Sequence, residues 1–352
     1  MLRRIKTSVV TFKKVNWQQQ RSTQIHFPIP FAHQNVPIFK TSATNCNRAF
    51  TCSVKQATNF GTEFGYTTEQ RGSLYDDNYR MYLKNSDGDI ISPFHDVPLR
   101  AGGDIYNMVV EVPRWSNAKM EISKDEKMNP IKQDKKNGEL RFVANCFPHT
   151  GYPWNYGALP QTWEDPNHLD PLTGAKGDSD PIDICEIGSQ IHNTGSIVQV
   201  KLLGILALID EGETDWKIIG IDVKDPNAGH LNNIGDVEKI MPGLLKATVR
   251  WYKIYKTPFG NPPNKFAFNG EIQGVEFTHR VVADVHTTWK TLMLGKMNSH
   301  SYIDRSCTMF KGPHTIHPYD AQCALEAKSV KGDPKKYDMV VNKWHYIKDT
   351  NM

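Results

Sequence analysis

Alternating apolar and polar residues predict short β-strands through much of this chain. The pattern is clear over residues 106–112, where Tyr106, Met108 and Val110 occupy alternate positions until Pro113 ends the run. Further strand candidates are residues 119–122, 140–146, 182–187, 197–208 and 216–223. Turns rich in glycine and aspartate separate the later candidates, a spacing typical of a small closed β-barrel.

Strand geometry also predicts which side chains share a face. Because a pleated strand sends alternate residues to one side, Lys119 and Glu121 are expected to point together. By the same geometry, Arg141 lies on the face opposite Leu140 and Phe142. We therefore expect these strands to share one polar face.

Helical periodicity appears only in the second half of the chain. In residues 244–256 apolar side chains follow i, i+4, i+7 spacing and a Thr-Pro pair ends the helix, which places Tyr255 and Lys256 at its C-terminus. A second amphipathic stretch covers residues 275–294. The chain from about residue 296 is predicted to be an irregular tail. The predicted fold class is α+β, mainly β with flanking helices.

The first 62 residues differ in composition from the rest of the chain. They contain nine Lys or Arg and no Asp or Glu. This composition is typical of an organelle transit peptide and favours the mitochondrial matrix over the cytoplasm. The alternative is a disordered basic arm that binds nucleic acid. Residues 63–352 are predicted to form a single domain.

Charge and composition narrow the class of protein. The chain carries 42 Lys and Arg against 38 Asp and Glu, but without residues 1–62 the balance becomes 33 against 38. A mildly acidic body argues against a surface that binds nucleic acid phosphates. No apolar run is long enough to cross a bilayer. Six cysteines without a C-x-x-C pair indicate neither a zinc site nor a disulfide framework.

Two clusters of carboxylates carry the candidate chemistry. Asp178, Asp180 and Asp183 lie within six residues, and a second cluster runs from Asp210 to Asp215 between two predicted strands. If these strands are neighbours of the strand after Asp183, both clusters meet at one end of the sheet, where their repulsion requires cations. All-oxygen sites of this kind suit hard ions such as Mg²⁺. For a single cluster, an acidic surface loop would be the better interpretation.

Basic and phenolic residues near strand and helix ends suggest what the cations act on. The groups able to hold phosphate oxygens are Lys119, Arg141, Lys217, Lys256, Tyr156 and Tyr255. Neither a G-x-x-x-x-G-K-[ST] loop nor a G-x-G-x-x-G motif occurs, so metal ions would have to neutralise the phosphates. The pattern slightly favours a metal-dependent phosphate hydrolase over a structural metal-binding barrel.

The run Asp-Ser-Asp-Pro-Ile-Asp at residues 178–183 resembles the signature of the family I soluble inorganic pyrophosphatases, D-(S/G/D/N)-D-(P/E)-hydrophobic-D. The segments similar to eukaryotic members are 111–121, 145–149, 151–157, 160–166, 210–217 and 251–256. The resemblance implies a five-stranded OB-type closed barrel flanked by helices, and a homodimer. It fades in the tail beyond about residue 296.

The resemblance also implies a set of metal ligands. Asp178, Asp183 and Asp215 would hold a first Mg²⁺ ion, and Asp183 would also help to hold a second. Asp210 and Glu121 would complete the sites for additional ions. The implied cofactor is therefore several Mg²⁺ ions in one active site.

The remaining matched positions imply the catalytic and substrate-binding groups. Asp180 would be the base that takes a proton from a metal-activated water, which then attacks phosphorus in line. The residues that would hold the two phosphates are Lys119, Arg141, Tyr156, Tyr255 and Lys256. Glu111 and Lys217 match active-site positions without an assigned role.

The predicted function is therefore Mg²⁺-dependent hydrolysis of inorganic diphosphate to two phosphates, without a membrane or nucleic acid partner. The alternative is a non-enzymatic OB-type binding subunit of a larger assembly. Nucleic acid binding by such a barrel requires aromatic and basic strand faces, whereas the polar face predicted here is rich in carboxylates. A nucleotide phosphohydrolase would need a base-binding pocket that the sequence does not indicate.

Overall fold

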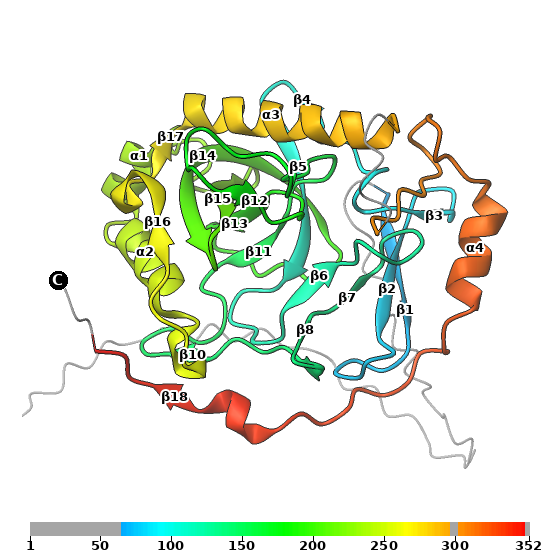
Figure 1. Ribbon diagram of the computed structural model, residues 1–352, viewed down its shortest axis with the longest axis horizontal. Helices are drawn as coiled ribbons and strands as arrows, with labels where there is room; N and C mark the ends of the chain where they lie inside the picture. Colours follow the sequence, from blue (N-terminus) through cyan, green and yellow to red (C-terminus); the bar gives the residue numbers. More distant parts are fainter. Residues whose placement is uncertain (1–64, 296–301, 349–352) are drawn as a thin grey trace, which may run out of the picture. The chain divides into compact units, whose positions relative to one another are not determined.

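Five strands form a closed, hydrogen-bonded ring at the centre of the fold (Figure 1). The structure is a computed structural model that describes residues 65–295 and 302–348. In chain order the ring strands are β5 (Ile105–Val112), β11 (Asn155–Ala158), β13 (Asp183–Glu186), β14 (Ile197–Asp210) and β15 (Glu213–Asp222). Strand β14 pairs with both β5 and β15, which closes the ring in the order β5-β11-β13-β15-β14. The predicted five-stranded barrel is confirmed.

The ring strands bury both of their faces, which explains their long apolar runs. Successive side chains of a strand point to opposite faces, so neighbouring residues enter different parts of the core. Ile218 of β15 joins a core cluster that contains Val281, whereas Ile219 joins another that contains Trp251. Each cluster also contains residues from a flanking helix, and the helices therefore complete the core on both faces of the ring.

Three helices lie against the ring. Helix α3 (Val275–Met293) contacts β14 and runs along the top of the ring in Figure 1, and α2 (Leu244–Ile254) buries Trp251 and Tyr252. Both agree with the predicted helices to within two residues at each end. Helix α1 (Ile234–Ile240) was not predicted, because only one of its residues, Val237, is buried and its apolar pattern is weak.

A second sheet lies beside the ring and corrects part of the strand prediction. It contains β1 (Thr67–Arg71), β2 (Arg80–Lys84), β3 (Ile90–Ile91), β6 (Met120–Ile122) and β7 (Ile131–Gln133). The predicted strand 119–122 is thus present as β6, but it pairs with β7 outside the ring.

The predicted strand 140–146 is wrong as a continuous element. Only its ends are strands, in β9 (Glu139–Leu140) and β10 (Asn145–Cys146). Between them, the Arg141 N–H donates to Asp134 and the Arg141 carbonyl accepts from Lys119. These bonds to two different segments replace the regular ladder that the alternating sequence suggested.

Short strands complete the sheets, and their bounds are β4 (Arg100–Gly102), β8 (Lys135–Lys136), β12 (Lys176–Gly177), β16 (Lys265–Phe266) and β17 (Gln273–Gly274). Strand β4 pairs with β5, β8 pairs with β9, β12 pairs with β15, and both β16 and β17 pair with β14. Single 3₁₀ turns are η1 (Thr257–Phe259), η2 (Ala267–Gly270) and η3 (Met339–Asn342).

The C-terminal stretch is more ordered than the irregular tail that we predicted. It contains helix α4 (Pro318–Glu326), which packs Ala321 and Leu325 against Tyr82. It ends in β18 (Trp344–His345), which pairs in parallel with β10 (Figure 1). The helix was missed because it is short and buries only two side chains.

The predicted extension, residues 1–62, lies outside the described residues. All described residues belong to one compact unit. Within them, no helix has both the length and the apolar character that a membrane span requires.

Candidate active site

Strand β15 brings the two acidic clusters together. Strand β12 runs parallel to it with Gly177 opposite Thr214, and β13 runs parallel to it with Asp183 opposite Lys217. The segment 178–183 connects these two strands and therefore passes along residues 214–217. The prediction that the clusters meet at one place on the sheet is confirmed.

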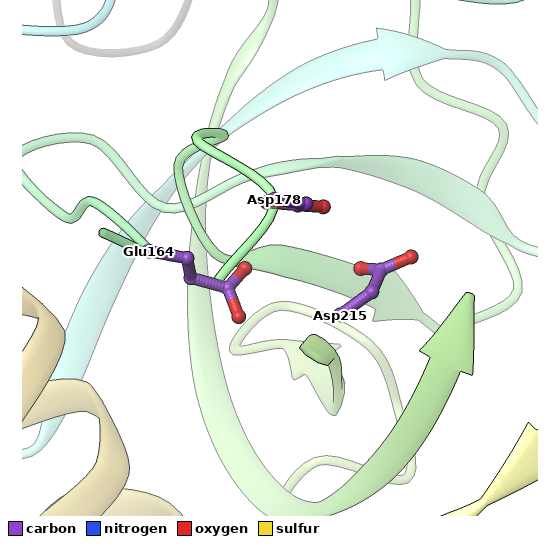
Figure 2. Close-up of side chains that lie close together, drawn as sticks. All are labelled: Glu164, Asp178 and Asp215. Atoms are coloured by element: carbon purple, nitrogen blue, oxygen red, sulfur yellow. The ribbon is translucent and has the colours of Figure 1, made fainter. Parts of the chain in front are cut away.

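Three carboxylates form the core of the site; Glu164 and Asp215 are buried and Asp178 is half-buried. Glu164, Asp178 and Asp215 each contribute one oxygen to a group in which all three atoms lie within 4.8 Å of one another. Figure 2 shows their carboxylates directed toward a common space. Burial and mutual repulsion raise the pKa of Glu164 and Asp178 well above the usual carboxylate value. Burial also raises the pKa of Asp215, to about 7, although Lys217 opposes the shift.

This donor set fits a hard divalent cation. All three ligand atoms are carboxylate oxygens, which is the chemistry that Mg²⁺ prefers. Moreover, Oε2 of Glu164 is buried and has no hydrogen-bond partner in the part of the chain that the structure describes. A buried carboxylate oxygen without a partner is costly unless a cation compensates it. Glu164, Asp178 and Asp215 are therefore the residues that could hold such an ion.

Glu164 is a site residue that the sequence analysis missed. Its backbone N–H donates to the Asp180 carbonyl at 3.0 Å, and its carbonyl accepts from the Ser179 N–H at 2.9 Å. These bonds place its side chain beside the signature segment, and its Oε1 accepts from the Trp216 N–H at 3.2 Å. Its only sequence signal was its position in the matched segment 160–166.

Lys217 and Tyr156 lie beside the three carboxylates. The Lys217 ammonium pairs with Asp183 and lies 2.5 Å from Asp215 Oδ1. Burial would lower the pKa of Lys217, but the two aspartates outweigh this effect and raise it well above the usual value. The Tyr156 hydroxyl donates to Asp183 Oδ2 at 2.5 Å and accepts from Lys217 at 3.0 Å. Asp183 is thus held from two directions.

Asp210 binds the end of helix α2. The Tyr255 hydroxyl donates to Asp210 Oδ2 at 3.0 Å, and the Lys256 ammonium lies 2.5 Å from Oδ1. Tyr255 is the C-cap residue of α2, as its sequence position predicted. The chain at the C-terminal end of the helix therefore presents both groups to the last residue of β14.

Lys119 and Glu121 point together, as predicted from strand geometry. The Lys119 ammonium lies 2.8 Å from Glu121 Oε2 and 3.3 Å from Asp134 Oδ2. Arg141 also pairs with Asp134, at 2.7 Å. Asp134, which was not predicted, therefore holds two of the expected phosphate-binding cations in fixed positions.

Asp180 and Glu111 complete the predicted set. Asp180 is partly exposed, and its Oδ1 lies 2.5 Å from the ammonium of Lys124, another residue that the sequence analysis missed. Glu111 is buried and accepts the Ile122 N–H at 2.7 Å. Burial and the charge of Asp183 raise the pKa of Glu111 well above the usual value.

The structure brings all of the predicted site residues into one connected region. Lys119 interacts electrostatically with Asp180, and Tyr255 with both Arg141 and Lys217. Arg141, Tyr255 and Lys256 line one pocket of about 420 Å³. The arrangement thus combines a largely buried carboxylate cluster with cations and phenols near a pocket, which suits a metal ion and a phosphorylated ligand.

Comparison with known proteins gives a consistent result. A family model described as inorganic pyrophosphatase matches residues 108–290. The chain is 52% identical over 284 residues to the inorganic pyrophosphatase of Drosophila melanogaster, covering 80% of this chain and 84% of that protein. It is also 52% identical over 263 residues to the human inorganic pyrophosphatase, covering 75% of this chain and 91% of that protein.

Solved structures agree with the sequence comparison. The inorganic pyrophosphatase of Schistosoma japonicum superposes with a TM-score of 0.74 at 49% identity, covering 80% of this chain and 100% of that one. A truncated vacuolar soluble pyrophosphatase of Trypanosoma cruzi, solved in complex with PPi, superposes with a TM-score of 0.60 at 37% identity, covering 73% of this chain and 98% of that one.

Proposed function

Because this chain belongs to the family I inorganic pyrophosphatases of eukaryotic type and is an inorganic diphosphatase, we propose that it hydrolyses diphosphate with a water activated by several Mg²⁺ ions. The observation that carries the metal requirement is the cluster of Glu164, Asp178 and Asp215. Bound Mg²⁺ supplies two things, a lower pKa for the attacking water and neutralisation of phosphate charge.

The carboxylates divide into two groups of proposed metal ligands. Asp178 and Asp215 would hold one ion together with Glu164, whose unpartnered oxygen points to this role. Asp183, Asp210 and Glu121 would hold further ions, and each already lies beside a lysine. Oxygen ligands that are fixed by hydrogen bonds or ion pairs need little reorganisation when a cation binds.

Asp180 is the proposed general base. It lies at the centre of the signature segment, and its side chain is 36% exposed, so that it can reach a water at the surface of the carboxylate cluster. Its carboxylate would accept the proton of the water that attacks phosphorus. Its backbone is fixed on both sides through the Glu164 and Asp178 hydrogen bonds, which keeps the carboxylate in place.

The cations and phenols would hold the substrate. Arg141, Tyr255 and Lys256 line the pocket, and Lys119 and Tyr156 lie beside Glu121 and Asp183. Such groups would stabilise the charge that develops on the bridging oxygen as it leaves. Their ion pairs with the carboxylates keep them oriented before substrate binds.

The proposal is tested by phosphate release from diphosphate in the presence of Mg²⁺. Asp180→Asn should bind Mg²⁺ but lose turnover by about 10²- to 10⁴-fold, because an amide cannot accept a proton. Asp183→Asn should also lose activity, through weaker metal binding. Asp333→Asn, at an exposed position in the C-terminal stretch, is the matched control. Near-normal rates in both active-site variants, or an inactive parent protein, would contradict the proposal.

Two further proposals concern the whole chain. We propose that it forms a homodimer, which sedimentation velocity would test, with a monomer at micromolar concentration as the contrary result. We also propose that residues 1–62 direct the protein to the mitochondrial matrix, since they are basic and free of acidic residues. A fluorescent reporter fused to these residues would remain diffuse in the cytoplasm if this proposal is wrong.

A further inference from the structure

We propose that Lys124 is a positioning residue for Asp180 and that residues 302–304 of the C-terminal stretch hold both groups in place. This inference rests on the proposed role of Asp180 as the base. It arises from two separate contacts that the C-terminal stretch makes with the signature segment and with the chain after β6.

The first observation is the ion pair of Lys124. Its ammonium lies 2.5 Å from Asp180 Oδ1, and its side chain is 29% exposed. Lys124 follows β6, the strand that carries Glu121, and β6 belongs to a different sheet from β12 and β13, which flank the signature segment. Because the Lys124 ammonium binds Oδ1 of Asp180, Oδ2 of Asp180 is left to accept the proton of the water.

The second observation is the anchoring of the Lys124 backbone. Its carbonyl accepts the Asp304 N–H at 2.6 Å. The Asp304 carbonyl in turn accepts from Asn129 Nδ2 at 3.0 Å and lies 3.0 Å from Nε2 of His95. Since Trp289 Nε1 donates to His95 Nδ1 at 3.0 Å, Nε2 must carry the proton and donate to Asp304.

These anchoring groups are deeply buried. His95 and Asn129 are fully buried, and Trp289 is 1% exposed. Burial lowers the pKa of His95 to about 3, so the ring is neutral and its tautomer is set by the two hydrogen bonds. The segment that supports Lys124 is therefore fixed to the core and not to the surface.

The third observation is on the other side of Asp180. The Tyr302 hydroxyl and Ser179 Oγ are 2.8 Å apart. Ser179 has φ of 72°, in the left-handed region that is unfavourable for a residue with a side chain. A hydrogen bond from outside the segment stabilises this conformation of the residue between Asp178 and Asp180. The same C-terminal stretch thus supports Asp180 in two ways, through the neighbouring residue Ser179 and through the lysine Lys124 that pairs with it.

The decisive experiment compares Lys124→Met with Lys127→Met, an exposed lysine three residues further on. We expect Lys124→Met to lower kcat for diphosphate by about 10- to 100-fold with KM changed less than about threefold, and Lys127→Met to resemble the parent. Lys124→Arg, which keeps the charge, should recover most of kcat. A raised KM at unchanged kcat would instead make Lys124 a substrate-binding group and overturn the inference.

A double-variant cycle separates positioning from a general structural effect. A group that acts through the Asp180 carboxylate loses its effect when that carboxylate is absent, so Lys124→Met in the Asp180→Asn background should lower kcat no further. If the fold-losses in kcat of the two single variants multiplied in the double variant, the inference would be contradicted. Tyr302→Phe and Ser179→Ala should each lower kcat by a few-fold, and the double variant by no more than one of them. If kcat were unchanged in both Tyr302→Phe and Ser179→Ala, the proposed role of the C-terminal stretch would be wrong.

Different results would contradict the role of Asp180 as the base and the role of Lys124 as its positioning residue. If Asp180→Asn retained parental turnover, the proposed base would be wrong, and the inference with it. If Asp180→Asn lost turnover while Lys124→Met remained as active as Lys127→Met, only the positioning role would be wrong. Thermal unfolding of every variant, with Tm within about 2 °C of the parent, shows that the comparison is made between folded proteins.

Discussion

Replacing Lys217, the lysine that pairs with Asp183 and Asp215, should show how much its positive charge stabilises the fold. The Lys217 side chain is 4% exposed, lies 2.5 Å from Asp215 and also pairs with Asp183. Lys217→Met keeps an unbranched apolar side chain of similar length but leaves the two aspartates without this partner. Loss of one partner of a buried ion pair typically destabilises a protein by about 3–5 kcal/mol.

Proton uptake by one of the two aspartates limits how large the loss of stability can be. An aspartate that loses its cation can become neutral instead, which at pH 7 costs about 4 kcal/mol relative to an ordinary aspartate pKa of about 3.9. We therefore expect Lys217→Met to lower the free energy of unfolding by about 3–4 kcal/mol in the absence of divalent ions. Mg²⁺ should recover part of this loss, because it supplies positive charge to the same carboxylates.

Urea denaturation in EDTA and in Mg²⁺, followed by tryptophan fluorescence, measures both effects. Lys239→Met is the matched control, since that side chain is 79% exposed and lies 3.8 Å from its acidic neighbour, and it should change the free energy of unfolding by less than about 0.5 kcal/mol. A loss below about 1 kcal/mol for Lys217→Met in EDTA, or a loss that Mg²⁺ leaves unchanged, would refute the reasoning.

Four other predictions follow from the carboxylate cluster and the segment beside it. The pKa of Asp215 is raised to about 7 in the folded protein, so from about pH 4 to about pH 7 the folded state holds a proton that the unfolded state has released. Without divalent ions, the free energy of unfolding should therefore fall by about 3 kcal/mol between pH 5 and 8, most of it below pH 7. A free energy of unfolding in EDTA that rises or stays level over this range would contradict the prediction. For the same reason, Mg²⁺ binding at pH 7 should release protons, and calorimetric heats that are equal in buffers of different ionisation enthalpy would argue against this. Glu164→Gln should weaken Mg²⁺ binding at least about tenfold, with Glu276→Gln at an exposed position of α3 as control, and an unchanged affinity would remove Glu164 from the metal site. In Gly177→Ala the new Cβ would lie 2.5 Å from the Glu164 carbonyl carbon, so the segment must shift and Tm should fall by about 2–8 °C, whereas a parental Tm would show that the loop adapts freely.

The sequence predicted strands and helices well where the periodicity of apolar residues matches the face that the element buries. Strand β14 and helix α3 are long, and each carries a sustained apolar pattern, so their existence and approximate bounds followed from the sequence. The stretch 140–146 has the same alternation as a strand, yet its middle hydrogen-bonds to two different segments. Local alternation does not specify a partner, and a strand requires one.

The candidate site shows a similar division. The residues around Asp180 and Asp183 were recognisable because several carboxylates fall within one short segment. Glu164, Asp134 and Lys124 were missed because each lies in a segment outside the two acidic clusters, and nothing in its local sequence shows that it faces them. Their importance depends on side chains that lie close only after the chain has folded.

By itself, the sequence determined the residue types, the acidic signature, the apolar strands and the family resemblance. The tertiary structure decided which carboxylate faces which cation, because β12 and β13 both align with β15 and so bring Asp178 and Asp183 to Asp215 and Lys217. The physical reason is that electrostatic energies depend on distance in space and on burial. Neither quantity is encoded in the local periodicity from which strands and helices are predicted.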